Sequence, residues 1–291
     1  MLERNNKYCG IVMNIERDFI HEVVNNFYDS IMQDGDLCGY SEASPVNGNY
    51  DDEIYQKIYA LKYLPAYYFE YCVLASELAE RLEEKGVDEI NVSSFGCGLY
   101  PDYFALMHNL QDIEFDYSGY DISKWKTRDL LPESDNNLCL KTMSIADITQ
   151  TELNDTDVFI FPKSLGDIAE NIDMQAFASK IASTPKDTVY FLNSFITVNH
   201  NLNHHHVELF SLVHDAMLKQ GFTTEDPSDE TFYRGGKQFL GLKAINYGFD
   251  YPEEGKHLCE EGAELDCKCR VVHNPVLTNS YMNYQILEYT R

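Results

Sequence analysis

The first third of the chain carries apolar residues at the spacing of amphipathic helices. From residue 11 to residue 33 they recur four positions apart and predict one helix with a buried face. Residues 51–85 predict a second helix, which Pro65 kinks or breaks and which Gly86 ends as a C-cap. Most of the tyrosines around Pro65 suit inter-helix packing, and a minority are candidates for a substrate pocket. Residues 1–86 are therefore expected to form a helical unit over the substrate site.

Beyond residue 86, short apolar runs alternate with helical stretches. This alternation predicts βαβ units and a mostly parallel sheet. The runs at 157–161 and 188–192 are almost entirely apolar, which is typical of strands covered on both faces. The expected strands are 89–95, 115–120, 138–143, 157–161 and 188–192, and the expected helices are 101–110, 123–131, 171–183 and 203–220.

The last strand signals indicate a change of direction. Two strand-like stretches, 222–234 and 237–246, flank Gly235-Gly236, a pattern that favours an antiparallel hairpin. Residues 247–291 follow as a C-terminal tail with its own cysteines and a final apolar run. The predicted fold class is therefore α/β, with a Rossmann-like, mostly parallel sheet over residues 87–246 and a late antiparallel hairpin strand.

Charge and composition narrow the functional classes. The net charge of −26 repels phosphate backbones, so we expect no nucleic-acid partner. The N-terminus lacks the apolar stretch of a secretory signal, and no run of about 18 apolar residues predicts a membrane span. Eight cysteines in a chain without a secretory signal indicate reduced thiols. A cytoplasmic protein is therefore expected.

The chain is organised around residues 89–102, where a β-prone run reaches Gly96-Cys97-Gly98 and then turns helical. A strand that turns through small residues into a helix directs backbone N–H groups at a ligand above the sheet edge. Glycines let that ligand approach the backbone closely. A single Gly-x-Gly is a weak signal of a nucleotide site. Whether this turn binds a nucleotide therefore has to be judged from the segments that follow it.

Four segments, in order, resemble motifs of class I S-adenosylmethionine-dependent methyltransferases. They are 92–98 (the glycine turn), 119–123 (an acid ending the second strand), 144–148 (an acid facing adenine) and 157–164 (the fourth strand). The late hairpin is similar to the reversed final strand of that family. The resemblance covers about residues 87–246 and implies S-adenosylmethionine as the cofactor. It implies cofactor contacts from Ser94, Phe95, Gly96, Cys97, Gly98, Asp121, Ile122, Asp147, Ile148 and Phe161.

Two acids are central to that implied site. Asp121 would accept hydrogen bonds from both ribose hydroxyls, and it follows Gly98 by 23 residues, near the roughly 20 typical of such acids. Asp147 would face the adenine amino group. Each acid also has an alternative role. Asp121 could be a turn residue that caps a helix starting at Ser123, and Asp147 could be a helix N-cap or a solvated loop acid.

Two positions depart from the family pattern. Ser94 stands where an acid is usual and Tyr100 where a third glycine is common, so the contact to the cofactor's amine must come from elsewhere. Residues 161–164 also lack the Asn/Asp-Pro-Pro-Tyr pattern of amino-directed nucleic-acid methyltransferases. The expected function is therefore methyl transfer to a small molecule or to a peptide or protein side chain.

Other functions stay open beside it. The pattern Gly96-x-Gly98-x-x-Pro101 also resembles, more loosely, nicotianamine-synthase-like enzymes, which transfer the aminocarboxypropyl group of the same cofactor. Ser94 and Tyr100 keep open a non-catalytic cofactor-binding or regulatory protein of the same fold. An NAD-dependent oxidoreductase would prefer a glycine at position 101.

Lys163 and Asp167 are the candidate catalytic residues, because they follow the fourth strand, where a substrate would meet the methyl donor. Either could act as a general base or orient the substrate. An ordinary surface Lys–Asp ion pair is the alternative.

The C-terminal tail holds a candidate zinc site. Thiolate and imidazole ligands suit tetrahedral zinc. The spacing is Cys-x-Cys and not the Cys-x-x-Cys of a zinc knuckle, so reduced cysteines on a hairpin are the alternative. The candidate ligands are Cys259, Cys267, Cys269 and His273.

Overall fold

The N-terminal helices form where the sequence predicts them. A computed structural model describes residues 13–34, 50–134, 137–195, 200–228, 232–233 and 283–291. Helix α1 spans Arg17–Ile31, and α2 spans Glu53–Lys85 and continues through Pro65. Asp52 caps the first turn of α2 with its carboxylate. Gly86 ends α2 with φ 66°, a left-handed conformation that glycine adopts readily.

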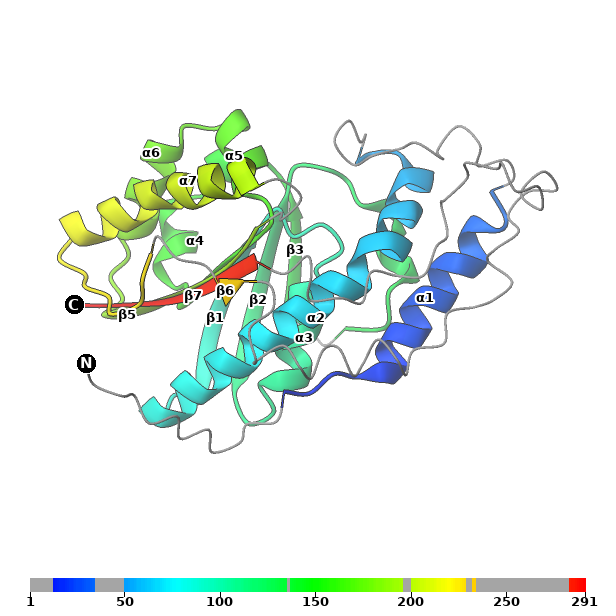
Figure 1. The fold of residues 1–291 in the computed structure, drawn as a ribbon, viewed down its shortest axis with the longest axis horizontal. Coiled ribbons are helices and arrows are strands. Elements are labelled where there is room, and N and C mark those ends of the chain that lie inside the picture. Colours follow the sequence, from blue (N-terminus) through cyan, green and yellow to red (C-terminus); the bar gives the residue numbers. More distant parts are fainter. Residues whose placement is uncertain (1–12, 35–49, 135–136, 196–199, 229–231, 234–282) are drawn as a thin grey trace.

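The strands form one mostly parallel sheet. Among the described residues they are β1 (Glu89–Phe95), β2 (Glu114–Asp121), β3 (Leu138–Thr142), β4 (Val158–Pro162), β5 (Thr188–Ser194), β6 (Phe232–Tyr233) and β7 (Asn283–Thr290). Their order is β3-β2-β1-β4-β5-β7-β6 (Figure 1). Neighbours from β3 to β5 are parallel, whereas β7 is antiparallel to β5 and β6. The predicted Rossmann-like α/β class with a reversed late strand is confirmed.

The reversed strand comes from a later part of the chain than predicted. β7 belongs to residues 247–291, which the sequence assigned to a tail, and the expected strand 237–246 lies outside the described residues. β7 fits beside β5 because alternate residues from Tyr284 to Tyr289 belong to the two hydrophobic cores on opposite faces of the sheet. A local glycine pair signals a turn, but it does not show which distant segment completes the sheet.

The remaining helices depart from the predicted bounds, and α7 begins three residues earlier than expected. They are α3 (Pro101–Asn109), the 3₁₀ turns η3 (Lys126–Leu130) and η4 (Ile145–Asp147), α4 (Gln150–Asn154), α5 (Leu165–Asn171), α6 (Met174–Ala182) and α7 (His200–Lys219). The expected helix 123–131 is only the turn η3. The expected helix 171–183 begins as the end of α5 and restarts as α6, because Asp173 caps a new first turn.

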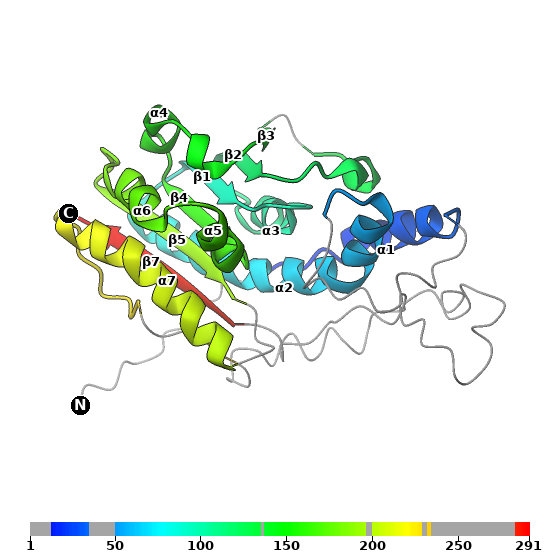
Figure 2. The same ribbon diagram turned by 90° about the horizontal axis from the view of Figure 1, so that it is seen from above.

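A hydrophobic core lies on each face of the sheet. Helices α2 and α3 cover one face, with α1 packed on α2, and α5, α6 and α7 cover the other (Figure 2). The N-terminal half of α2 and helix α5 flank the edge where β1, β2 and β4 end (Figure 1). Ligands of open α/β sheets bind outside this carboxyl edge. No helix within the described ranges combines the length and the apolar character needed to cross a membrane.

Candidate functional site

The turn after β1 has a backbone conformation that glycine provides. Gly96 has φ 75° and Gly98 has φ 54°. The N–H groups of Gly96 and Cys97 donate to the Tyr120 carbonyl at 2.7 and 3.1 Å, which joins the turn to the end of β2. A Cβ atom on Gly96 would lie 2.6 Å from the Cβ atom of Ser164. Sterics and backbone conformation therefore both require glycine at position 96.

Tyr100 adopts a left-handed conformation where the resembling family often has a third glycine. It stands at the N-terminus of α3 with φ 40° and ψ 51°. Such a conformation costs a residue with a Cβ atom about 1–3 kcal/mol. The tyrosine ring stacks on Phe104 with centroids 5.3 Å apart, and the Arg128 guanidinium lies 5.7 Å from its centre. Packing of the ring thus holds the backbone in a path that glycine would take without strain.

Asp121 anchors the glycine turn to the end of β2. Its Oδ2 atom accepts the N–H of Gly98 at 2.8 Å, and its Oδ1 atom accepts the N–H of Ser123 at 2.8 Å. Burial raises the pKa of Asp121, and these hydrogen bonds, together with the Arg128 guanidinium, oppose that rise. The bond to Ser123 closes a turn after β2, whereas the helix that the alternative placed at Ser123 is absent, because η3 begins only at Lys126. Each carboxylate oxygen keeps a second lone pair, with which it can accept a ligand hydroxyl.

Two residues that sequence reasoning missed support the same turn. Arg128 on η3 donates through Nε and Nη2 to the Gly98 carbonyl at 3.0 and 2.7 Å. The Trp125 ring packs against Gly98, where an added Cβ atom would lie 3.1 Å from it. Trp125 is the single tryptophan of the chain, which is a signal that could have drawn attention to it. Nothing local marks Arg128, because its partner lies 30 residues earlier.

Five of the expected cofactor residues have buried side chains. Ser94, Phe95, Cys97, Ile148 and Phe161 are each at most 2% exposed. The two phenylalanine rings and Ile148 belong to the core beneath α5, α6 and α7. Burial raises the pKa of the Cys97 thiol well above its usual value, so this thiol stays protonated. These side chains support the edge from inside, which leaves only their backbone to face a ligand.

Ile122 and Asp147 are exposed at the carboxyl edge. Ile122 follows β2 directly and is 67% exposed, an unusual degree for a large apolar side chain. Asp147 is exposed at the end of η4. Lys180 fixes that turn by donating through Nζ to the carbonyls on both sides of Asp147, at 3.0 and 2.9 Å. Ile122 and Asp147 thus present an apolar surface and a carboxylate to a ligand at this edge.

Lys163 belongs to a buried ion pair and not to a surface Lys–Asp pair. Its Nζ atom lies 2.6 Å from Glu70 Oε2, and the two side chains are 7% and 1% exposed. Nζ also donates to the Phe195 carbonyl at 2.9 Å. The φ of Lys163 is 56°, a strained value of the kind that clusters at functional sites. Lys163 thereby joins α2, which carries Glu70, to the ends of β4 and β5.

Asp167 and Tyr50 lie within electrostatic reach of Asp121. Asp167 is exposed in the first turn of α5, where partial burial and then the carboxylates of Glu170 and Asp121 raise its pKa. Burial, followed by the charges of Asp167 and Asp121, raises the pKa of Tyr50 to about 12. The end of β2, the start of α5 and the turn before α2 therefore border one region.

Aromatic rings gather in this region and form what we call the aromatic cluster. Neighbouring ring centroids in it lie 5.3 to 6.1 Å apart. The rings of Tyr50, Tyr59, Tyr63 and Tyr67 are only half-buried. Part of the tyrosine group around Pro65 therefore remains accessible instead of filling the core. The aromatic cluster consists of Tyr50, Tyr55, Tyr59, Tyr63, Tyr67 and Trp125.

Comparison with known proteins finds distant similarity to solved structures. No protein-family model and no curated protein sequence matches the chain. Solved structures do match it, and several are S-adenosylmethionine-dependent methyltransferases.

Three of these matches illustrate how distant the similarity is. The plantazolicin methyltransferase BpumL is 10% identical, with a TM-score of 0.47 over 92% of this chain and 99% of that one. An S-adenosylmethionine-dependent methyltransferase from Mesorhizobium loti is 11% identical, with a TM-score of 0.41 over 75% and 98%. The cyclopropane synthase MmaA2 from Mycobacterium tuberculosis is 11% identical, with a TM-score of 0.41 over 76% and 84%. At these identities the likeness concerns the fold alone.

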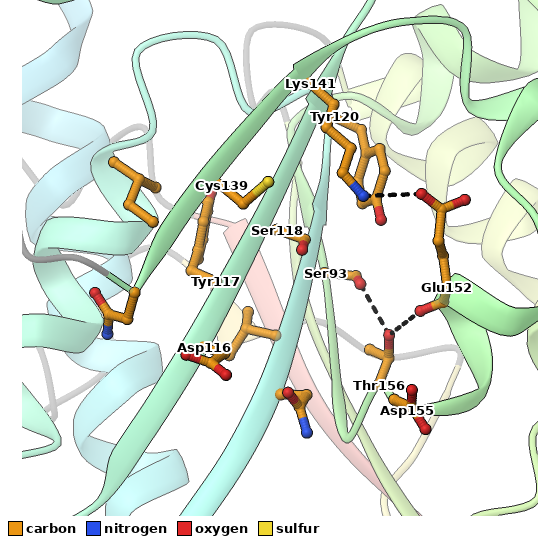
Figure 3. A pocket seen from close by; sticks show the side chains of 14 residues that line it. Ser93, Asp116, Tyr117, Ser118, Tyr120, Cys139, Lys141, Glu152, Asp155 and Thr156 are labelled. Carbon is orange, nitrogen blue, oxygen red and sulfur yellow. Dashed lines mark hydrogen bonds and ion pairs between the residues drawn. The ribbon is translucent and has the colours of Figure 1, made fainter.

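A concavity in the described part of the chain is lined by residues other than those expected to bind the cofactor. Its volume is about 350 Å³, and β1, β2, β3 and α4 line it (Figure 3). Lys141 and Glu152 form an ion pair of 2.8 Å across it, and the hydroxyls of Ser93 and Thr156 are 2.8 Å apart. These polar groups bond to one another. None of the expected cofactor residues lines this concavity, so it is separate from the candidate site.

The candidate zinc ligands cannot be placed. Cys259, Cys267, Cys269 and His273 lie outside the described residues. Within the part of the chain that the structure describes, no three His, Cys, Asp or Glu side chains are grouped to hold a metal ion.

Proposed function

We propose that this protein is an S-adenosylmethionine-dependent methyltransferase that acts on a small molecule or on a peptide or protein side chain. The observation that carries the proposal is the 2.8 Å hydrogen bond from the Gly98 N–H to Asp121 Oδ2 at the carboxyl edge. It fixes a glycine turn beside a strand-end carboxylate. In open α/β sheets, this pairing serves a ligand that contains a ribose.

The residues of the edge suit the parts of that cofactor. The backbone of the glycine turn after β1 suits the methionine part of the cofactor. Asp121 suits the ribose hydroxyls, because each of its oxygens retains a lone pair beyond its bond to the backbone. The exposed surface of Ile122 suits a face of adenine, and Asp147 suits the adenine amino group.

The protein's task in such a transfer is alignment. The cofactor supplies a methyl group on a positively charged sulfur, and a nucleophile has to meet it in line and away from water. We assign α1 and α2 the role of covering the substrate. The Lys163–Glu70 pair fixes α2 against the ends of β4 and β5, and so acts as a positioning element. Asp167 is the proposed proton acceptor, because its raised pKa brings it closer to neutral pH.

The proposal includes a cytoplasmic setting without nucleic-acid or membrane partners. Its support is the net charge of −26, which repels anionic polymers and lipid headgroups. The free thiols of Cys72, Cys97 and Cys139 agree with a reducing compartment.

Calorimetric titration of the full chain with S-adenosylmethionine, S-adenosylhomocysteine and NAD tests the proposal. We expect both sulfur nucleotides to bind and NAD not to bind. Absence of binding by both sulfur nucleotides would overturn it. Product analysis then separates the two transfers, because methyl transfer releases S-adenosylhomocysteine and aminocarboxypropyl transfer releases methylthioadenosine.

A further inference from the structure

We propose that the acceptor is an amine nitrogen, carried by a cationic small molecule or side chain that the aromatic cluster recognises. The inference rests on the proposed function, because it assigns a substrate class to the same edge of the sheet. Its support comes from the angles between the rings, from the charges around them and from the cations that two of the rings already face.

The rings of the aromatic cluster present their faces in different directions. Tyr50 meets Tyr55 at 77° and Tyr59 at 80°. Tyr59 in turn meets Tyr67 at 67°, and only Tyr63 and Tyr67 are stacked, at 16°. Ring faces that meet steeply can surround a compact positive charge, as in the aromatic cages that bind ammonium groups. A flat aromatic acceptor would instead need a slot between parallel faces.

The accessible rings keep neutral phenol groups. Burial raises the pKa of Tyr59 and Tyr67 well above that of a free tyrosine. Their attraction for a cation therefore comes from the ring faces, whose quadrupole is negative at the face.

The charges beside the cluster favour a positive ligand. The carboxylates of Asp121 and Asp167 both act on Tyr50, and Glu170 lies near Asp167. Of the basic side chains here, Lys163 pairs with Glu70, Arg128 bonds to the Gly98 carbonyl, and Lys62 lies over the Tyr63 ring. The edge thus has a surplus of carboxylate, which attracts cations and repels anions.

Two rings of the cluster already face a cation, and for Tyr63 it is the ammonium of the exposed Lys62, 5.0 Å from the ring centre. The Lys163 ammonium lies 5.0 Å from the centre of the Tyr67 ring, within the distance of a cation–π contact. Glu70 neutralises the Lys163 ammonium at 2.6 Å. The charge of Lys163 therefore does not cancel the attraction of the cluster for a further cation.

Methylation of an amine is chemically balanced at this edge. The nitrogen first gives up a proton to Asp167 or to water, and its lone pair then forms the bond to the methyl carbon. The carbon–sulfur bond breaks with its electron pair remaining on sulfur, which becomes neutral. The positive charge therefore passes from sulfur to nitrogen, and the region has to accommodate a cation before and after transfer.

The test compares a cation with its uncharged isostere. The full chain, loaded with S-adenosylhomocysteine, is titrated with choline and with 3,3-dimethylbutan-1-ol, which has the same shape but a carbon in place of nitrogen. We expect choline to bind at least about tenfold more tightly, the size of a partly desolvated cation–π effect. Tyr59→Leu, at the centre of the cluster, should abolish this preference, and Tyr59→Phe, which keeps the ring, should retain it.

The outcomes separate this inference from the function on which it rests. Asp167→Asn is a second variant that leaves the rings in place, and it should lower the preference for choline severalfold while S-adenosylhomocysteine still binds. Binding of the nucleotide together with equal or absent binding of both probes would overturn the amine inference and leave the proposed function standing. An unchanged preference in Tyr59→Leu would also overturn it. Failure of the nucleotide itself to bind would overturn both proposals.

Discussion

Gly98 and Asp121, 23 residues apart in the chain, are joined by a 2.8 Å hydrogen bond from a main-chain N–H to a carboxylate oxygen. The other oxygen of Asp121 holds the N–H of Ser123 at 2.8 Å. The turn after β1 and the turn after β2 therefore share one buried anchor. A ligand that bonds to this carboxylate meets the glycine turn in a fixed position, which favours binding because little has to be ordered on association.

Replacing the anchor should weaken the cofactor. Asp121→Ala is expected to lower the affinity for S-adenosylhomocysteine by about 1–3 kcal/mol, because the ribose hydroxyls lose their acceptor. Calorimetric titration measures the change. Asp129→Ala removes an exposed carboxylate from the neighbouring η3 turn and is the matched control, which should bind like the wild type. Equal affinities of all three proteins would mean that Asp121 only caps the turns.

Tyr100 offers a test of the left-handed backbone. Tyr100→Gly and Tyr100→Ala both lose the buried ring, so both should be less stable than the wild type. With φ at 40°, however, glycine should be more stable than alanine by about 1 kcal/mol. Urea unfolding of the two variants measures the difference.

The control for Tyr100 is a helical position with ordinary backbone angles. At Met107, in the interior of α3, alanine should be more stable than glycine by about 1 kcal/mol. If alanine is also the better residue at position 100, the left-handed turn does not persist in solution.

The features that could be predicted from the sequence are those that depend on neighbouring residues. Strand runs, helix ends and the glycine turn follow from neighbouring residues, and so does Asp121 as an acid at the end of a strand. Whether a motif residue faces a ligand or the core is less local. Phe161 and Ile148 match the family's positions, but the structure buries both side chains, and Ile122 is the residue whose side chain is exposed.

The features that could not be predicted depend on contacts between residues far apart in the chain. β7 completes the sheet beside β5 from nearly a hundred residues further along the chain, and no local signal names that pairing. Glu70 and Lys163 come from a helix and a strand end that only the folded chain brings together. From the sequence, Lys163 was predicted to be a general base or a surface charge. In the structure it is instead buried and paired with Glu70.

The Glu70–Lys163 pair should behave as a buried unit. Lys163→Met leaves Glu70 buried without its partner and is expected to lower the free energy of unfolding by about 3–5 kcal/mol, as is Glu70→Leu. The double variant should be more stable than either single one, because no isolated charge remains. A double-mutant cycle by urea unfolding measures the coupling.

A half-exposed ion pair provides the comparison. Lys141 and Glu152 are 2.8 Å apart with side chains 31% and 30% exposed, so Lys141→Met should cost no more than about 1 kcal/mol. A similar small cost for Lys163→Met would show that the buried pair is open to water.

Glu77 should give the protein a dependence of stability on pH. This half-buried residue of α2 has a pKa raised by burial to about 7, despite Arg81 nearby. In the unfolded chain its pKa is near the ordinary 4.5. The folded state therefore binds the proton more tightly, and its contribution is complete below pH 4.5 and is lost as the pH rises to about 7. The free energy of unfolding should fall by roughly 3 kcal/mol over this range from Glu77 alone.

Glu77→Gln isolates that contribution, because glutamine stays uncharged at every pH. The variant should match the wild type near pH 4.5 and exceed its stability by roughly 3 kcal/mol at pH 8. Urea unfolding at several pH values measures the difference between the two proteins, which cancels the titration of other groups. Parallel pH profiles of wild type and Glu77→Gln would contradict the raised pKa of Glu77.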